Sequence, residues 1–562
     1  MVVGAKMTIQ HVPSKGRISI IKIQNFTVQK RQSVIRVVYG TLLAVLAVVS
    51  MAVSPVELFT DWYLDMKEGK YIYRMWQKPT YELFSEVHIF NYTNVDEYMK
   101  GTDKTMKLKE IGPFMFQEFR TNDNITIDKE RGVMTMWPKT ELKFLREKSI
   151  ADYKDVHVVM PNIVMIAFST LIADKLGYLA NAGAYYSINA IGSKLFLNMT
   201  AEELLWGYTD PIVSIANTLL PGWIDFEKIG ILDRFYAQRE EKAELELRNK
   251  SKRFSINYWN DSPGLVEQGF KDLNTSNLCN RIRGSYEGFM LPPQISKDTV
   301  FPIFRKQACR IYPFSFREEV KGEFGFNYYR FQLQDSAFNK TSPYACDCSQ
   351  NCLPDGFIDI SNCYYGFPIT LSKPHLIDTD PVQRTYFEGL DHADGDKYTS
   401  LLDVEPTIGV PLALSINIQV NIAVRTSPAN PITKPLKDKV LPVLRLSLFC
   451  KEAPSNIIQL LRLRFVIAPP LVVTIEVLLF IVGVFFSLQG FYRIWKPTYK
   501  LLQQNEKPKS RRKSSERRRN SAILSMSDNC GFRDDEELAK QAVSLLAITE
   551  EDRDMPDLFG DP

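Results

Sequence analysis

Two long runs of apolar residues dominate the pattern of hydrophobic and polar positions along the chain. The first, Val37–Val56, contains no charged residue, and the second, Phe465–Tyr492, contains only Glu476. A helix needs about 20 apolar residues to cross the ~30 Å hydrocarbon core of a bilayer. We therefore predict transmembrane helices over residues 37–56 and 465–492. The first run is too long, and starts too late, for a cleaved signal peptide, so we interpret it as a retained signal-anchor.

Basic residues flank the two predicted spans on one side of the membrane. Residues 1–36 contain seven Lys or Arg and no Asp or Glu, and the segment after the second span contains the basic stretch Arg511–Arg519. Because basic flanks tend to stay in the cytosol, we predict that residues 1–36 and 493–562 are cytoplasmic. Residues 57–464 then form an ectodomain that faces the outside or a lumen.

Two features of the second span bear on its start. The pair Pro469-Pro470 favours a helix that begins near Leu471, because proline is tolerated in a first turn. Glu476 would then lie in the outer turns, where a carboxylate costs less than at the bilayer centre. Two roles for Glu476 stay open: a side chain that snorkels to the interface, or a contact with the first span.

The ectodomain pattern changes character along its length. Alternating apolar and polar residues at Leu83–Phe90 predict a strand, and the spacing of apolar residues over 158–206 predicts several helices. Thr200 and Glu203 have the spacing of a capping box at the last of these. From Phe254 to Ile422, short strand-like runs alternate with turn residues. We predict a mostly β ectodomain with a helical insertion.

Composition adds little to this picture. The chain has 562 residues, a net charge of +4 and 45% hydrophobic residues, which suits several ordinary domains or one large one. It contains no Gly-x-Ser-x-Gly, Walker A, His-Glu-x-x-His or dinucleotide-binding motif. We therefore expect a protein that is not an enzyme, uses no cofactor or metal, and binds no nucleic acid.

Six of the eight cysteines lie between residues 279 and 363, within the predicted ectodomain. Cysteines pair in an oxidising compartment, so we predict three disulfides, and the fifteen connectivities of six cysteines stay open. The spacing of Cys346, Cys348 and Cys352 does not suit zinc, and the chain has only five His. Cys450 is left over, either as a buried free thiol or in an intermolecular bond.

Seven Asn-x-Ser/Thr sequons lie in the ectodomain and agree with its predicted side of the membrane. The predicted glycosylation sites are Asn91, Asn124, Asn198, Asn249, Asn260, Asn274 and Asn339.

Short segments scattered over about residues 35–495 resemble those of the class B scavenger receptors. Three of them are Glu110-Ile-Gly-Pro-Phe114, Lys373-Pro-His375 and Leu402-Asp-Val-Glu-Pro-Thr-Ile-Gly409. The others are Trp76-Gln-Lys-Pro79, Phe90-Asn-Tyr-Thr-Asn94, Glu203-Leu-Leu-Trp-Gly-Tyr-Thr-Asp-Pro211, Cys309-Arg-Ile-Tyr312 and Asp359-Ile-Ser-Asn-Cys363.

The resemblance implies an α+β fold: an antiparallel β-barrel-like ectodomain with a helical-bundle apex, here 158–206, flanked by two transmembrane helices. It also implies an apolar tunnel through the barrel. By the same resemblance, the disulfides are Cys279–Cys346, Cys309–Cys363 and Cys348–Cys352.

The resemblance also implies that the helical apex captures ligands, and that basic residues at the apex bind acidic ligands. The corresponding stretch of this chain, Asn189–Lys194, has one lysine. Lys175 and Lys194 are the candidate ligand-binding residues, although neither matches a family lysine position for position. A neutral lipid cargo is therefore favoured over a polyanion.

Three functions follow from these observations. The first is a plasma-membrane receptor that binds fatty acids, sterols, carotenoids or lipoprotein lipid and assists their uptake through the tunnel. The second is an endosomal or lysosomal trafficking receptor for a protein partner. The third is a sensory-neuron co-receptor for lipid pheromones, which would use the same tunnel chemistry.

The C-terminal tail after Trp495 is polar and is predicted to be disordered. Tyr499-Lys-Leu-Leu502 has the pattern of a sorting signal that binds cytosolic adaptors. The basic stretch Arg511–Ser521 suits either plain solvation or attraction to anionic lipid. In the second case, phosphorylation at Ser514, Ser515 or Ser521 would release it.

Overall fold

The computed structural model describes residues 14–505 except 176, 220–225, 238–239, 275–276, 347, 349–351 and 392–394. Two compact units divide the chain, residues 1–491 and 492–562, and the fold below is that of the first. Residues 496–505, which were predicted to be part of a disordered tail, belong to a helix that extends to Asn505. The rest of the tail and the candidate sites Ser514, Ser515 and Ser521 lie outside the described residues.

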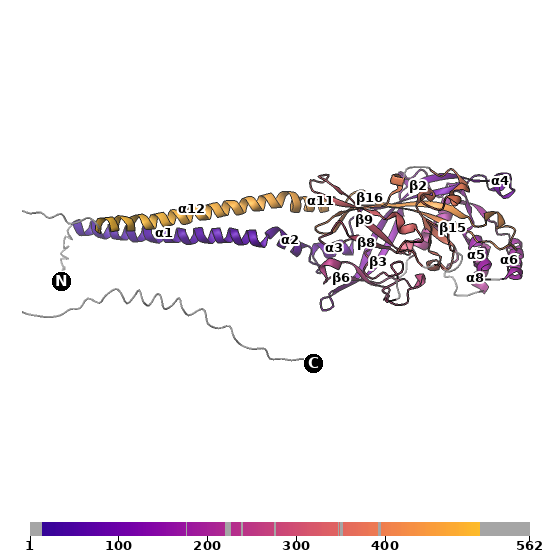
Figure 1. Ribbon diagram of the computed structural model, residues 1–562, viewed down its shortest axis with the longest axis horizontal. Helices are drawn as coiled ribbons and strands as arrows, with labels where there is room; N and C mark the ends of the chain where they lie inside the picture. Colours follow the sequence, from indigo (N-terminus) through magenta and orange to yellow (C-terminus); the bar gives the residue numbers. More distant parts are fainter. Residues whose placement is uncertain are drawn as a thin grey trace, which may run out of the picture. The chain divides into compact units, whose positions relative to one another are not determined.

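A curled sheet forms most of the ectodomain (Figure 1). Its first strands are β1 (Leu83–Tyr92), β2 (Met106–Asp128), β3 (Val133–Phe144), β6 (Ala243–Glu246), β7 (Ile256–Trp259), β8 (Val300–Arg305), β9 (Arg310–Val320) and β10 (Tyr328–Leu333). The later strands are β11 (Ile358–Asp359), β12 (Ile369–Ser372), β13 (Phe387–Glu388), β14 (Leu401–Glu405), β15 (Val410–Ala423) and β16 (Val440–Cys450).

In the described part of the chain this sheet has 14 strands, with the main order β7-β6-β3-β2-β1-β16-β15-β14-β10-β9-β8. All its strand pairs are antiparallel except β13 with β2. The predicted strand at Leu83–Phe90 is confirmed as β1, and its inward residues alternate with half-buried ones. The central strands β15 and β16 are buried on both faces over most of their length, as expected for strands covered on both sides.

The two edges of the sheet meet through a short connecting segment. The amide of Ile256 in β7 donates to the carbonyl of Ser285, and the amide of Phe304 in β8 donates to the carbonyl of Tyr286. Trp259 and Phe304 also pack edge to face across the seam, with ring centroids 5.1 Å apart. Backbone groups that an open edge would leave unpaired are thus satisfied, and the sheet curls into a barrel-like body.

Helices cover the end of the sheet and connect it to the membrane. They are α1 (Ser14–Val53), α2 (Pro55–Tyr63), α3 (Tyr71–Gln77), α4 (Val95–Met99), α5 (Ile163–Lys175), α6 (Tyr178–Ile191), α7 (Ala201–Trp206), α8 (Pro211–Leu219), α9 (Ile231–Phe235), α10 (Pro381–Thr385), α11 (Ser455–Arg462) and α12 (Ala468–Asn505).

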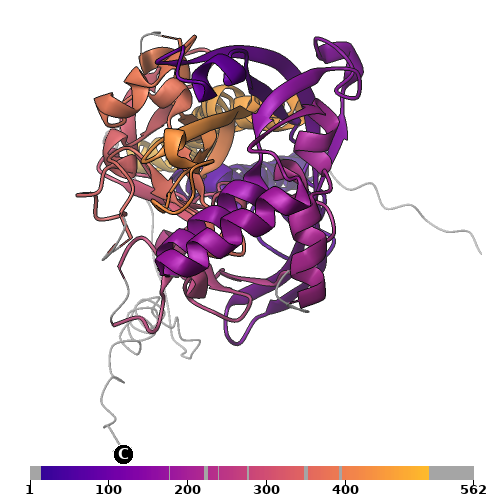
Figure 2. The same cartoon turned by 90° about the vertical axis from the view of Figure 1, so that its right-hand side faces the viewer.

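The predicted helical insertion 158–206 holds α5, α6 and α7, which Figure 2 shows in magenta across the end of the sheet. The capping box at the start of α7 is confirmed, because the Thr200 hydroxyl accepts from the Glu203 amide and the Glu203 carboxylate accepts from the Thr200 amide. The insertion also contains two paired strands that the helical pattern did not predict, β4 (His157–Pro161) and β5 (Phe196–Thr200). Strands this short carry too few residues to show their period.

The two membrane helices α1 and α12 lie side by side (Figure 1). A Cβ added at Gly40 would lie 2.6 Å from the Gly483 carbonyl oxygen, so only glycine allows this close approach. The Ser50 hydroxyl donates to the Glu476 carboxylate at 2.6 Å, and Glu476 is buried. Of its two open roles, the structure shows the contact with the first span.

Both membrane helices differ in their bounds from the predicted spans. The first helix ends at Val53, because Ser54 takes a left-handed conformation and Pro55 begins α2. The second does not begin near Leu471: α11 continues through a π-helical turn, Leu463–Ile467, into α12. A proline ring clashes with the carbonyl four residues earlier, and for Pro469 and Pro470 those carbonyls lie in this wider turn.

Three disulfides link the connections outside the central strands. They are Cys279–Cys346, Cys309–Cys363 and Cys348–Cys352, which are the pairs that the resemblance implies. The first two close loops of 67 and 54 residues. Bridges over such loops typically stabilise a fold by ~2–4 kcal/mol each, mainly by restricting the unfolded chain.

Candidate functional site

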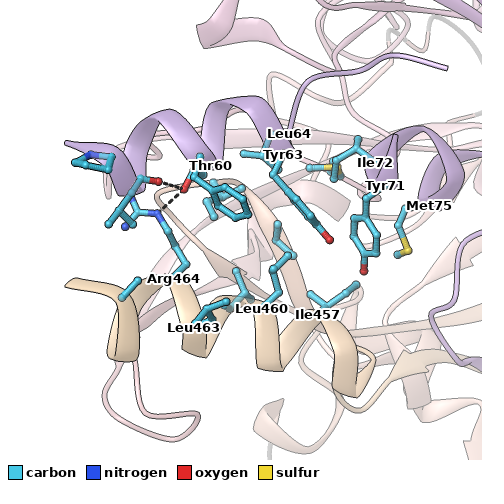
Figure 3. Close-up of a pocket in the computed structure, with 18 of the residues that line it drawn as sticks. Thr60, Tyr63, Leu64, Tyr71, Ile72, Met75, Ile457, Leu460, Leu463 and Arg464 are labelled. Atoms are coloured by element: carbon cyan, nitrogen blue, oxygen red, sulfur yellow. Dashed lines mark hydrogen bonds between the residues drawn. The ribbon is translucent and has the colours of Figure 1, made fainter. Parts of the chain in front are cut away.

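An apolar cavity of about 280 Å³ lies where the ectodomain meets the membrane helices. We call it the membrane chamber. Its walls come from α2, α3, α11 and the π-helical turn (Figure 3). The lining also includes Ala468 and Val472 from the first turns of α12. The residues are Pro55, Val56, Phe59, Thr60, Tyr63, Leu64, Tyr71, Ile72, Met75, Tyr81, Phe289, Met290, Ile408, Val410, Ile457, Leu460, Leu461, Leu463, Arg464, Ala468 and Val472.

The sequence of α11 explains how one wall of the membrane chamber forms. Ile457, Ile458 and Leu461 recur at helical spacing and are buried against the sheet. Leu460 of α11 and Leu463, the first residue of the π-helical turn, line the chamber, and Figure 3 shows them opposite Tyr63 and Thr60 of α2. One helix therefore packs on the sheet and lines the chamber at the same time.

Polar groups are few in the membrane chamber, and they are paired or poorly ionisable. Arg464 donates from Nε to the Thr60 hydroxyl at 2.6 Å, and Thr60 donates to the Val56 carbonyl at 2.7 Å. Burial raises the pKa of Tyr63 to about 12, so its phenol stays neutral at physiological pH. The chamber therefore suits an apolar molecule better than a charged one.

A second cavity, of about 440 Å³, is lined by ectodomain residues alone, and we call it the inner chamber. Its lining mixes apolar residues with charged ones. Within it, Arg120 and Glu287 form an ion pair at 2.7 Å. The other residues are Lys78, Pro79, Thr80, Tyr81, Glu82, Leu83, Gln117, Glu118, Phe119, Thr121, Gly288, Phe289, Arg305, Pro411, Leu412, Ala413, Leu414 and Cys450.

Two residues, Tyr81 and Phe289, line both chambers. Their rings meet edge to face with centroids 5.5 Å apart. The Tyr81 hydroxyl donates to the Pro411 carbonyl at 3.0 Å. The pair therefore forms a partition between the two chambers.

The barrel wall contains a partly buried cluster of charged side chains, which we call the wall cluster. His88 of β1 lies 2.7 Å from the Glu86 carboxylate through Nε2 and 2.8 Å from that of Glu110 through Nδ1. Arg445 of β16 donates to Glu110 at 2.8 Å. His375 approaches Glu110 from another segment, at 3.4 Å. Two of the family-like segments, those of Glu110 and His375, thus meet here.

The two histidines of the wall cluster have opposite protonation behaviour. Burial opposes the charged form of His88, but its bonds with Glu110 and Glu86 outweigh burial and raise the pKa of His88. Burial also opposes ionisation of Glu110, yet His88 and Arg445 lower its pKa to about 2. Burial dominates for His375 and lowers its pKa to about 4. In agreement, His375 Nδ1 accepts a hydrogen bond from the Asp391 amide at 3.1 Å, as a neutral ring would.

The two candidate apex lysines lie at opposite ends of the α5–α6 pair. Lys175 is the last residue of α5, and its side chain lies outside the described residues. Lys194 is exposed in the connection from α6 to β5. The surface between them is apolar, because Tyr178, Leu179 and Tyr186 of α6 are 65%, 84% and 70% exposed. A ligand-binding role for the lysines stays a prediction.

The predicted glycosylation sites differ in exposure. Asn124, Asn198, Asn249, Asn260 and Asn274 are exposed, and Asn339 is half-buried. Asn91 is half-buried in β1, and its side-chain oxygen accepts a hydrogen bond from the Val159 amide at 2.7 Å. Glycosylation stays a prediction at all seven.

Cys450, the leftover cysteine, is a buried free thiol in this structure. Burial raises its pKa to about 11, so the thiol stays protonated and unreactive at neutral pH. Tyr499 belongs to α12 by its backbone, but its side chain lies outside the described residues. Binding of an adaptor there stays a prediction.

Sequence reasoning missed the residues of the membrane chamber. A signal was present in the amphipathic runs beside the spans, Pro55–Leu64 and Ile457–Leu463. Such a run on each side of an ectodomain, next to a membrane helix, indicates surfaces that meet at the membrane interface. The runs do not show that a cavity is left between them.

The fold and the site together define a class: two-pass membrane proteins whose disulfide-linked ectodomain carries an apolar cavity at the membrane. The chain belongs to the CD36 family, whose model matches residues 38–494. This confirms the resemblance drawn from the short segments.

The similar curated proteins carry two different names. Scavenger receptor class B member 1 of Rattus norvegicus is 27% identical over 384 residues, which are 66% of this chain and 71% of that protein. Lysosome membrane protein 2 of Mus musculus is 28% identical over 471 residues, 80% of this chain and 92% of that protein. The protein of that name from Homo sapiens is 28% identical over 469 residues, with the same two shares.

Proposed function

We propose that this protein is a receptor that takes up single lipid molecules through its ectodomain and releases them into the membrane, without a chemical step. The observation that carries the proposal is the membrane chamber. Its lining runs from the ectodomain residues Phe289 and Ile408 to Ala468 and Val472 of α12. A lipid in the chamber is therefore next to the bilayer while still shielded from water.

The energetics favour such a path for a long apolar cargo. Burial of each CH₂ group contributes about 0.8 kcal/mol, so an acyl chain has a strong drive to leave water. The walls of the chamber are mostly apolar, and two of their polar side chains, Thr60 and Arg464, already have hydrogen-bond partners in the protein. A cargo can thus enter the chamber and also leave it for the lipid.

The apex supports a neutral or apolar donor of cargo rather than a polyanion. The outer face of α6 carries exposed tyrosine and leucine, and its sequence from Tyr178 to Ile191 has no charged residue. Lipoprotein particles and lipid carriers are the donors that fit this surface. Fatty acids, sterols and carotenoids are the cargo classes that fit the chamber.

The site of action stays open between two membranes. One group of relatives is named for a scavenger receptor and another for the lysosome membrane. We propose the plasma membrane as the main site, with the endosomal or lysosomal membrane and a protein partner as the alternative.

The proposal is tested by filling the membrane chamber in the full-length protein. Leu460→Trp places an indole in the chamber, whereas Ile467→Trp puts the same ring on a neighbouring turn that does not line it. Each protein is purified in detergent, and the bound lipid is measured by mass spectrometry. We expect about tenfold less lipid per Leu460→Trp molecule, a loss of about 1.4 kcal/mol in binding, and no change for Ile467→Trp.

The same experiment separates the alternatives. A stoichiometric fatty acid, sterol or carotenoid in the wild-type protein names the cargo class. Equal lipid in all three proteins contradicts the chamber as the binding site. A wild-type protein that carries no lipid above a control membrane protein favours the receptor for a protein partner.

A further inference from the structure

The partition between the two chambers has an asymmetric construction. Tyr81 is tied to the start of β15 by its hydroxyl bond to Pro411. Phe289 packs through apolar contacts, which include the rings of Tyr81 and of Trp76, whose centroid lies 5.1 Å away. Phe289 follows Gly288, which has φ +83°, a conformation that side chains rarely adopt. Displacement of Phe289 therefore breaks apolar contacts alone, whereas displacement of Tyr81 also breaks a hydrogen bond.

The exposure of the pair distinguishes it from ordinary core packing. The edge-to-face pair Phe301–Phe331 in the sheet is almost completely buried, at 1% and 0%. Tyr81 and Phe289 are both only half-buried. Both chambers border the pair, so part of each ring faces a cavity instead of a packed neighbour.

We propose that Tyr81 and Phe289 form a width-selective constriction on the lipid path, which passes flexible chains more readily than rigid ring systems. This inference rests on the proposed function. The rings are in contact, so a cargo that passes between them from one chamber to the other must displace one of them. A single acyl chain is narrow and adapts its shape, whereas the fused rings of a sterol require Phe289 to swing fully aside and lose its contacts with Tyr81 and Trp76.

The constriction also explains why the two chambers differ in lining. The inner chamber has the Arg120–Glu287 ion pair, while the membrane chamber is nearly free of polar groups. The backbone of Glu287 and Gly288 leads directly to Phe289, so this ring stands on a segment fixed by that ion pair. An amphiphile can keep its head at the inner chamber while its chain passes between the rings.

The test measures transfer by the full-length protein reconstituted into phospholipid vesicles. Radiolabelled cholesterol or palmitate is presented on cyclodextrin, and uptake into vesicles is followed, with protein-free vesicles as background. We expect Phe289→Ala to raise the rate of cholesterol transfer about tenfold. This corresponds to a transfer barrier lower by about 1.4 kcal/mol, which is the size of a lost aromatic pair. Palmitate transfer should change by less than about twofold. Tyr81→Phe, which removes the bond to Pro411, should have a smaller effect in the same direction.

The matched control is Phe316→Ala. Phe316 is also a half-buried phenylalanine in an edge-to-face pair with a tyrosine, Tyr329 at 5.3 Å, but it lines neither chamber. We expect it to leave both transfer rates unchanged. Phe289→Leu, a milder change, guards against misfolding of the alanine variant and should give an intermediate cholesterol rate.

Each outcome decides the matter. A selective rise for cholesterol in the Phe289 variants supports the constriction. An equal rise for both probes, or no difference between Phe289→Ala and Phe316→Ala while the wild type transfers lipid, overturns the constriction and leaves the proposed function standing. If neither wild type nor Phe289→Ala transfers either probe above background, both ideas fail.

Discussion

The wall cluster and the membrane chamber lie in one ectodomain but are built from opposite kinds of interaction. In the wall cluster, Arg445, Glu86, Glu110 and His88 bridge three strands through short charged hydrogen bonds. In the membrane chamber, helices meet through apolar side chains around empty space. Charged bonds hold a single geometry, whereas apolar contacts tolerate displacement. The comparison indicates a rigid wall and a base that can widen for a cargo.

The largest effect is expected from removing the cation of the wall cluster. Arg445→Ala leaves Glu86 and Glu110 without it, and breaking a buried ion pair typically costs ~3–5 kcal/mol of unfolding free energy. Chemical unfolding of the full-length protein in detergent measures the loss. Lys139→Ala is the control, because its ion pair with Asp123 is exposed and such pairs contribute about 0–1 kcal/mol. Equal losses in the two variants would contradict a structural role for the cluster.

The pH dependence of stability should reveal the two histidines separately. The pKa of His375 is lowered in the folded protein, so the free energy of unfolding decreases as pH falls from about 6.5 to about 4. In this range the unfolded chain takes up a proton at His375 and the folded protein does not. The raised pKa of His88 acts in the opposite sense: its contribution is full below about 6.5 and is lost as pH rises through the folded pKa. In the wild-type protein the two contributions oppose each other.

Single variants break this opposition. We expect His375→Gln to lose less stability than the wild type as pH falls from about 6.5 to about 4, and His88→Gln to lose less stability than the wild type as pH rises above about 6.5. Melting temperatures of the full-length protein measured on both sides of about pH 6.5 give the two slopes. Slopes that shift in the same direction in the two variants would show that the histidines do not have opposite pKa shifts.

Truncation in the membrane chamber should cost less than truncation in a packed core. Leu460 is half-buried and faces empty space, so Leu460→Ala should cost about 1 kcal/mol, below the 2–5 kcal/mol of a fully packed leucine. Leu444→Ala in β16 supplies that packed reference, since Leu444 is fully buried. A Leu460→Ala loss as large as that of Leu444→Ala would mean that the chamber closes in solution.

The smallest effect is expected inside the membrane. Ser50→Ala removes the hydrogen bond to Glu476, and interhelical hydrogen bonds in membrane proteins average about 0.6 kcal/mol. The readout is the thermal stability of the protein in lipid nanodiscs, with Ser487→Ala, which loses the longer 3.3 Å contact to Thr41, as the comparison. If Ser50→Ala causes no loss of thermal stability, the contact with the first span is not stabilising, and the alternative role of Glu476, a side chain that extends to the membrane interface, is favoured.

Several features of the structure follow from local sequence alone. The spans are recognisable because length and apolarity are local properties of a run. The strand at Leu83–Phe90 and the capping box at Thr200 depend on a spacing of a few residues. The family-like segments indicate the family from sequence alone, since each is a short string of residues that can be matched by itself.

The site depended on tertiary structure. Arg445 and Glu110 are 335 positions apart, and no local pattern shows that one will neutralise the other. The contact between Tyr81 and Phe289 likewise joins residues far apart in the chain. A cavity is the space that packed side chains leave between them, so no single residue or local pattern predicts it. The sequence by itself determined the membrane spans, the class of fold and the family. Only the tertiary structure decided where the charges pair, where the second span continues as a helix, and where a lipid-sized space opens, because each depends on contacts between segments far apart in the chain.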